Sequence, residues 1–179
     1  MERVAAKMTD ALLSDERAKD TLAYLKERRG YEEDFIKWAG LGYVSPAIRE
    51  ELRDIFQGGT KFPYLTEEHT LAIPYHSGGD VRGFVFRSIS PTDKGGKYMD
   101  VFISEKDTKK YHLFGLMGIN LTGNAERDRD ITIVEGELDA LRASYFGLEN
   151  VVAAATPSSA PASRSWPSPA RRRRPRPSP

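Results

Sequence analysis

The sequence predicts an α/β fold, and three observations lead to this prediction. Apolar residues recur at helical spacing up to about residue 60, a strand-like alternation follows from residue 69, and a β-α-β pattern begins at residue 131. The chain has 179 residues, the length of one ordinary domain with a hydrophobic core. We therefore expect helices first, then a β-hairpin, then two parallel strands joined by a helix.

Three helices are expected before residue 60. Ser14 is a suitable N-cap for a helix over "DERAKDTLAYLKERRG". A short second helix over "YEEDFIKWAG" is expected to turn three side chains inward, those of Phe35, Ile36 and Trp38. The third helix, "SPAIREELRDIFQGG", has the clearest signals, because Ser45 suits the N-cap, Pro46 suits the first helical position and two glycines suit the end.

A β-hairpin is expected over "HTLAIPYHSGGDVRGFVFRSI", with its turn at Ser-Gly-Gly-Asp. Pro74 has no N–H to donate, so its strand is expected to be at an edge or bulged there. Phe84 and Phe86 fall on one face, where core packing is the favoured role over stacking on bases. The segment "SPTDKGGKYMD" is expected to be a loop, and "VFIS" a short strand.

The β-α-β unit consists of "ITIV", a helix from about Gly136 to Phe146, and "NVVAAA". A helix of this length is sufficient for a right-handed crossover between parallel strands. The apolar run ends at Glu135, which is therefore at the C-terminal end of a parallel strand, the position where α/β folds bind their ligands. Gly136 is expected to permit a sharp turn. Asp139 follows one helical turn later, so both carboxylates can face one crevice.

Carboxylates in this arrangement suit divalent-metal chemistry on phosphates, as ligands or as a general base. The alternative is that these acids only complement the dipole at the helix N-terminus. Spacing alone favours the second interpretation, because short motifs often match by chance.

Charge is divided unevenly along the chain. From Pro157 onward there are six arginines and no acid, among many prolines and serines, so residues 157–179 are expected to be disordered. Without these six, 21 basic side chains stand against 26 acidic ones, a formal charge of −5 for residues 1–156. The folded part therefore gives no general electrostatic support for nucleic-acid binding, which would need a local patch.

Several classes of protein are excluded by composition. The chain has no cysteine, which excludes disulfides and thiolate zinc sites. It has no apolar run long enough to cross a bilayer and no signal-peptide pattern at its N-terminus, so we expect a cytoplasmic protein without membrane association.

The segment "VEGELDALRA…G…NVVAA" resembles the first half of the Toprim domain, which DnaG-type primases, topoisomerases and some nucleases share. This form is most similar to bacterial and mobile-element primases. The resemblance implies that Glu135 is the catalytic, proton-transferring glutamate beside Mg²⁺ or Mn²⁺, that Gly136 is the turn glycine and that Asp139 is the following aspartate.

The resemblance extends upstream, because residues from about 18 to 116 look like the subdomain that precedes Toprim in primases. The hairpin is similar to the family's "FPI…G…GF…GR" and places the family arginine on Arg87. "GGKYMD" is similar to "PKYLN" and places the family lysine on Lys97, while "KYHLFGL" places a second lysine near Lys109. These three cations are expected to contact single-stranded DNA template or nucleoside triphosphates.

The resemblance implies three parts: a primase-type core subdomain over residues 1–128, a partial Toprim domain over 129–156, and the disordered tail over 157–179. The second Toprim element, an Asp-x-Asp that holds Mg²⁺, does not follow residue 155. The chain is therefore expected to be truncated after the first Toprim motif, with a tail that is either out-of-frame translation or a basic arm.

The implied activity is template-directed primer synthesis in DNA replication, with a replicative helicase as a further partner. This chain is expected to be inactive because its metal site is incomplete. Two alternatives remain open. One is a non-catalytic remnant that binds single-stranded nucleic acid. The other is a fragment of a Toprim nuclease or topoisomerase.

Overall fold

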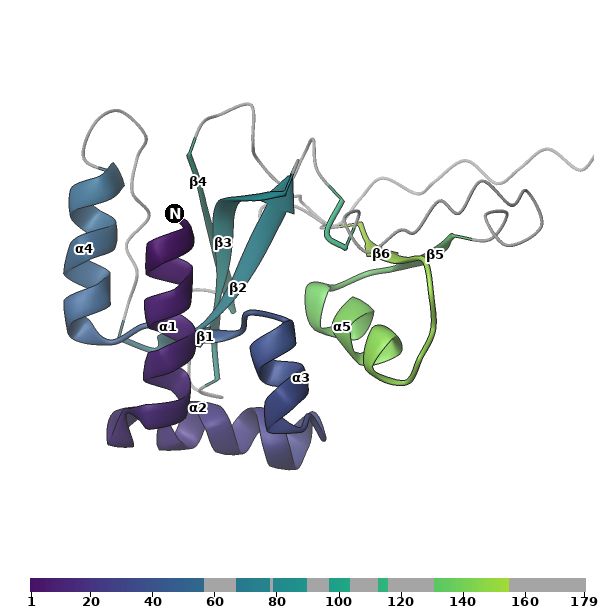
Figure 1. The fold of residues 1–179 in the computed structure, drawn as a ribbon, viewed down its shortest axis with the longest axis horizontal. Helices are drawn as coiled ribbons and strands as arrows, with labels where there is room; N and C mark the ends of the chain where they lie inside the picture. The colour runs from purple at the N-terminus through teal and green to yellow at the C-terminus, as the bar shows by residue number, and fades with distance from the viewer. Residues whose placement is uncertain (57–66, 78, 90–96, 104–112, 116–130, 155–179) are drawn as a thin grey trace, which may run out of the picture.

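The computed structural model describes residues 1–56, 67–77, 79–89, 97–103, 113–115 and 131–154. A four-stranded antiparallel sheet in the order β1-β2-β3-β4 carries helices on both faces, and a smaller parallel pair, β5-β6, lies beside it with helix α5 (Figure 1). The mixed α/β fold predicted from the sequence is confirmed. Lys109, the glycines after the third helix and the tail lie outside the described residues.

The elements have the following bounds. The helices are α1 (Glu2–Ser14), α2 (Lys19–Ala23), α3 (Glu33–Trp38), α4 (Pro46–Phe56) and α5 (Glu137–Tyr145), with a 3₁₀ turn η1 (Glu16–Ala18) and a π-helical turn η2 (Tyr24–Arg28). The strands are β1 (Gly42–Tyr43), β2 (His69–Ser77), β3 (Asp80–Ser88), β4 (Tyr98–Phe102), β5 (Thr132–Val134) and β6 (Val151–Ala153). Across the described residues, no helix is both long and apolar enough to span a membrane.

The prediction that Ser14 starts a helix is wrong. Ser14 is the last residue of α1, which the sequence interpretation missed, and its hydroxyl donates to the Asp10 carbonyl oxygen at 2.7 Å. Asp15 has an extended backbone that interrupts the helical path, and its carboxylate accepts a hydrogen bond from the Arg17 N–H at 3.0 Å. The signal for α1 was present, because its buried residues follow a spacing of four: Val4, Met8 and Leu12.

The predicted hairpin is confirmed. Strands β2 and β3 pair antiparallel, and Gly79 in the turn has a φ of +91°. Strand β1 pairs only with Leu71 and Ala72 of β2, so Pro74 lies beyond the end of β1, as expected for a residue without an N–H. Strand β4 begins at Tyr98, earlier than predicted, because Tyr98 pairs with Arg87 on β3.

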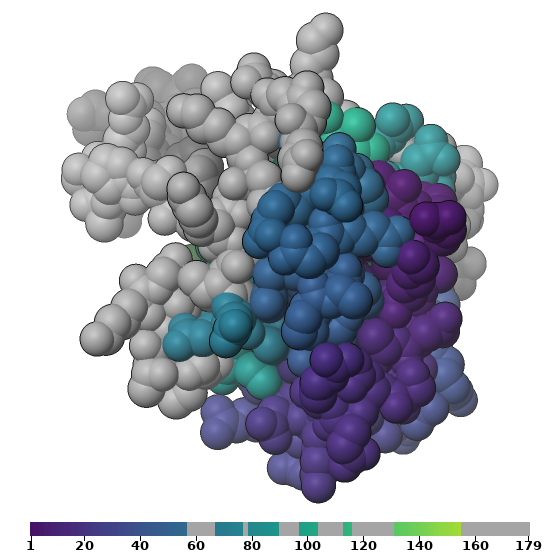
Figure 2. Space-filling view, turned by 90° about the vertical axis from the view of Figure 1, so that its left-hand side faces the viewer, coloured from purple at the N-terminus to yellow at the C-terminus, as the bar shows by residue number. Residues whose placement is uncertain are grey.

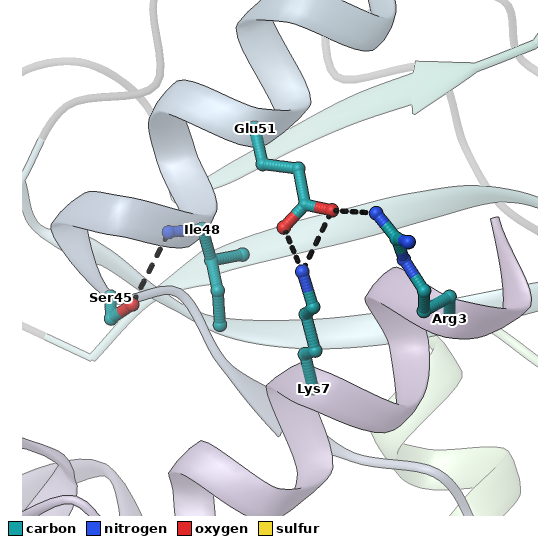
Figure 3. A network of polar contacts seen from close by, with 5 residues as sticks. All are labelled: Arg3, Lys7, Ser45, Ile48 and Glu51. Carbon is teal, nitrogen blue, oxygen red and sulfur yellow. Dashed lines mark hydrogen bonds and ion pairs between the residues drawn. The ribbon is translucent and has the colours of Figure 1, made fainter.

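Helices α1 and α4 cover one face of the sheet, where Figure 2 shows them side by side. On α4, Glu51 accepts hydrogen bonds from Lys7 at 2.7 and 2.9 Å and from Arg3 at 3.3 Å, which joins the two helices (Figure 3). Ser45 caps α4 as predicted, because its hydroxyl accepts from the Ile48 N–H at 3.3 Å. Phe84 and Phe86 are buried beneath these helices, which confirms their core role.

The opposite face of the sheet carries the turn η2, helix α3 and the β-α-β unit. Leu138 and Leu141 of α5 join Tyr75 and Val85 of the sheet in one buried cluster. In α3, Ile36 is fully buried as predicted. The expectation that Trp38 turns inward is wrong, because its side chain is 69% exposed. A six-residue helix buries one narrow stripe, and Trp38 lies outside it.

The β-α-β prediction is also confirmed. Strands β5 and β6 are parallel, with Ile133 opposite Val152, and α5 connects them. An isolated bridge joins Phe114 to Ala153 on the other side of β6. This arrangement places the C-terminal end of β5, and the acidic residues that follow it, near the face of the main sheet that carries Arg87.

Candidate functional site

The acidic corner, defined here as residues 135–139, begins where β5 ends. Glu135 is exposed, and Gly136 is the N-cap of α5 with an extended backbone, φ −128° and ψ 155°. The chain bends at Glu135 and Gly136, where the sequence predicts a turn, and any residue can adopt the backbone conformation of Gly136. A Cβ at Gly136 would lie 3.3 Å from the Oδ2 of the exposed Asp139 side chain.

The three acids of the corner have different surroundings. Glu135 and Asp139 are both exposed. The Asp139 side chain, 59% exposed, lies 3.7 Å from the guanidinium of Arg29. Glu137 is only 4% exposed, and its Oε1 accepts a hydrogen bond from the Tyr75 hydroxyl at 3.0 Å. Sequence reasoning missed Glu137, although its spacing of four from the buried Leu141 could have indicated an inward position.

The described residues do not by themselves complete a site for a Mg²⁺ or Mn²⁺ ion. A hard cation of this kind needs several oxygen ligands that converge on one point. Among the residues that the structure describes, no three acidic or histidine side chains are grouped in this way. Asp139 faces Arg29, and Glu137 accepts from Tyr75, so Glu135 is the acid of the corner for which no such pairing is seen in the described part.

Arg87 lies between two tyrosine rings. It is directly opposite Tyr98 on the neighbouring strand, so both side chains project from the same face of the sheet. The guanidinium carbon is 4.9 Å from the centre of the Tyr98 ring and 5.3 Å from that of Tyr24, and the guanidinium also donates to the Tyr98 hydroxyl. Arg87 is only 6% exposed, and its Nε has no hydrogen-bond partner among the described residues.

Tyr24 connects this stack to the acidic corner. Arg29 donates from Nε to the Tyr24 hydroxyl at 2.9 Å. A terminal nitrogen of the same guanidinium forms the ion pair with Asp139. Tyr24 begins the π-helical turn η2, which closes with the Arg29 N–H on the Tyr24 carbonyl at 3.3 Å. Short π-helical turns occur often at functional sites. A continuous series of contacts therefore runs from Asp139 to Arg87 and Tyr98.

Burial controls the tyrosine pKa values in this region. Burial raises the pKa of Tyr75, and the neighbouring Glu137 carboxylate raises it further. Burial also raises the pKa of Tyr98, which the Arg87 charge lowers and the Glu137 charge raises. Arg87 and Glu137 therefore both act on the Tyr98 hydroxyl, with opposite signs.

Lys97 differs from Arg87 because it is exposed. Lys97 is the residue just before β4, and its ammonium nitrogen lies 5.8 Å from the centre of the Tyr98 ring. The structure thus brings three predicted site residues, Asp139, Arg87 and Lys97, into one series of contacts through Tyr24 and Tyr98. Glu135 lies in the acidic corner with Asp139, two residues before Glu137, and Lys109 is outside the described residues.

The described surface also has two hollows, and Tyr24 lines the first of them. One, of about 490 Å³, is mostly polar and is lined by Thr21, Tyr24, Arg28 and Thr70 among others. The other, of about 520 Å³, is a largely apolar groove between α3 and α5, and the exposed Trp38 lies in its wall. Neither hollow contains a residue that the sequence placed in the site.

Comparison with known proteins gave matches among solved structures alone, since no protein-family model and no curated protein matches the chain. The Aquifex aeolicus primase, with its zinc-binding and RNA polymerase domains, is 28% identical with a TM-score of 0.63. The alignment covers 85% of this chain and 40% of that one. The RNA polymerase domain of Mycobacterium tuberculosis primase DnaG is 22% identical with a TM-score of 0.64, over 86% of this chain and 54% of that one.

A DnaG primase catalytic domain bound to single-stranded DNA also matches, at 19% identity and a TM-score of 0.59, over 87% of this chain and 52% of that one. The chain thus spans about half the length of the solved structures that it matches. At these identities the likeness establishes the fold. The fold of this chain is therefore similar to about half of a DnaG-type primase catalytic core.

Proposed function

We propose that this chain is part of a primase-like Toprim protein and that its own contribution is to bind the single-stranded DNA template for primer synthesis. The observation that carries the proposal is the series of contacts that links Lys97 and Arg87 to the acidic corner. Template and nucleoside triphosphates are polyanions, and a cationic edge beside a carboxylate corner suits both binding and phosphoryl chemistry. Residues 1–128 would form the template-binding part, residues 129–156 the start of the Toprim part, and residues 157–179 a separate tail.

Lys97 and Arg87 have different roles in this proposal. Lys97 is exposed, so its ammonium group can contact a phosphate directly. Arg87 is buried between the Tyr24 and Tyr98 rings. In this proposal it holds these rings in place beneath Lys97 and does not contact the template directly. The sequence predicts that Arg87 contacts template or nucleotide, and in this proposal Arg87 has a supporting role instead.

Binding is tested by fluorescence anisotropy with a labelled oligothymidylate over a range of NaCl concentrations. Lys97→Ala should weaken binding and reduce the slope of log K against log salt by about 0.7, the contribution of one phosphate contact to a single strand. The matched control is Lys37→Ala, which removes an exposed lysine ion-paired with Glu33 on α3. Equal effects of the two variants would show that binding does not use this surface.

Catalysis requires more than the described residues supply. Bound Mg²⁺ or Mn²⁺ would stabilise phosphate charge, and Glu135 would transfer a proton beside it, but further carboxylates would have to come from outside the described residues. We therefore expect no primer synthesis from this chain in an assay with template, nucleoside triphosphates and Mg²⁺. Mg²⁺-dependent synthesis that disappears in Glu135→Ala would overturn this part of the proposal.

The second candidate function is binding of single strands without catalysis. It is favoured by the Asp139–Arg29 ion pair, which engages one of the two predicted catalytic acids. Binding that survives Glu135→Ala but weakens in Lys97→Ala would support it.

A Toprim nuclease or topoisomerase fragment is less consistent with the upstream hairpin. The truncation, the mobile-element origin, the helicase partner and the cytoplasmic location stay predictions from the sequence.

A further inference from the structure

We propose that Glu137 is a positioning residue, whose buried carboxylate holds the first turn of α5 against strand β2 and thereby sets where Glu135 lies relative to the hairpin. The hydrogen bond from the Tyr75 hydroxyl to Glu137 is the contact that does this. The inference deepens the proposed function and rests on it only where DNA binding is the readout.

The geometry separates Glu137 from an ordinary surface acid. A glutamate is almost never fully buried unless it is paired, and Glu137 is 4% exposed opposite a Tyr75 that is 2% exposed. The two residues are 62 positions apart, so their 3.0 Å hydrogen bond joins two distant parts of the chain. A hydrogen bond to a charged acceptor is stronger than one between neutral groups.

Other polar contacts of α5 lead elsewhere. The Tyr31 hydroxyl donates to the Leu138 carbonyl oxygen at 2.9 Å, and Arg142 donates to the Arg29 carbonyl oxygen at 2.9 Å. Both reach the segment between η2 and α3 rather than the sheet. Among the hydrogen bonds seen in the described parts of the chain, the Tyr75–Glu137 bond joins α5 to the four-stranded sheet.

Glu137 lies two residues after Glu135, so its bond to Tyr75 also affects the position of Glu135. Glu137 opens α5, so its anchoring fixes the end of β5 and the backbone that carries Glu135. On the sheet side, Tyr75 packs edge-on against Phe102 at 5.3 Å and lies 5.2 Å from Phe114, so its hydroxyl is held by a packed ring. The corner and the hairpin are then held together by this hydrogen bond in addition to the apolar packing of Leu138 and Leu141 against the sheet.

The experiment measures the relative position of the two parts without any ligand. The chain has no cysteine, so Asp80→Cys at the hairpin turn and Leu148→Cys after α5 would each accept one spin label. Pulsed electron paramagnetic resonance then gives the distribution of distances between the labels. Tyr75→Phe, which removes only the hydroxyl, and Glu137→Ala should both broaden or shift this distribution.

Glu137→Gln is the conservative variant. Its amide oxygen can still accept from Tyr75, so it should retain the narrow distribution that Glu137→Ala loses. Glu51→Gln is the matched control, because it changes a glutamate that joins α1 to α4 and should leave the distance unchanged. Circular dichroism establishes that each variant is folded. If Glu137→Ala does not fold, Tyr75→Phe still decides the question, because it keeps the packed ring.

A distribution in Tyr75→Phe identical to that of the parent chain would overturn the positioning role. The same variants are then tested for oligothymidylate binding, where Tyr75→Phe should weaken binding and Glu137→Gln should retain most of the binding of the parent chain. If the parent chain does not bind DNA, the proposed function fails while the distance result stands. If it binds and the distances do not change, the positioning role fails while the proposed function stands.

Discussion

Arg87→Ala is expected to destabilise the fold as well as weaken DNA binding, because Arg87 is buried rather than presented at the surface. The variant removes a hydrogen bond between a charged guanidinium and the Tyr98 hydroxyl, worth about 1.5–3 kcal/mol. It also removes two cation–π contacts, at 4.9 and 5.3 Å, worth about 0.5–2 kcal/mol each. Relief of the desolvation cost of a buried charge offsets part of this loss. We expect a net decrease of about 2–3 kcal/mol in the free energy of unfolding.

The assay is urea denaturation followed by circular dichroism, in which the midpoint should fall while the slope m stays constant. Lys97→Ala is the matched comparison, because it removes an exposed cation beside the same Tyr98 ring and should change stability by less than about 0.5 kcal/mol. Arg87→Lys should recover only part of the loss, since an ammonium group is a point charge that cannot stack as a planar guanidinium does.

One result would refute this reasoning. If Arg87→Ala leaves the urea midpoint unchanged and loses DNA affinity with the same salt dependence as Lys97→Ala, then Arg87 contacts phosphate directly. The burial between Tyr24 and Tyr98 would then not describe the state that binds DNA.

Three further predictions concern the fold. Gly42→Ala should lower the melting temperature, because the new Cβ would lie 2.4 Å from the Met8 Cβ, and such overpacking costs about 1–3 kcal/mol; an unchanged melting temperature would contradict the close approach of α1 to β1. Burial raises the pKa of Tyr31 to about 12, so its contribution to stability is complete below pH 10 and is lost as the pH rises toward 12. Urea midpoints at pH 9 and 11 should therefore differ less in Tyr31→Phe than in the parent chain, and an equal difference would count against this. Ser45→Ala removes the N-cap hydrogen bond to Ile48 and should cost about 1 kcal/mol by urea denaturation, whereas a loss near zero would mean that α4 does not depend on its cap.

Local rules explain which elements were predicted correctly. The hairpin, the capped helix α4 and the β-α-β unit each carry a turn or cap signal together with an apolar period, and both are properties of neighbouring residues. The missed helix α1 carried a local signal, whereas two other errors depend on how the elements pack. Strand β4 starts at Tyr98 because that residue pairs with Arg87, and Trp38 is exposed because the short helix α3 buries only one stripe.

The sequence by itself determined the order of the elements that follow α1, the placement of Glu135 and Asp139 at the end of a strand, and the separation of a basic tail from the acidic remainder of the chain. Only the tertiary structure decided that Glu137 and Arg87 are buried and that Lys97 is exposed. The physical reason is that burial of a charged side chain depends on partners distant in the sequence. Tyr75 is 62 positions from Glu137, and no local pattern reports such a pair.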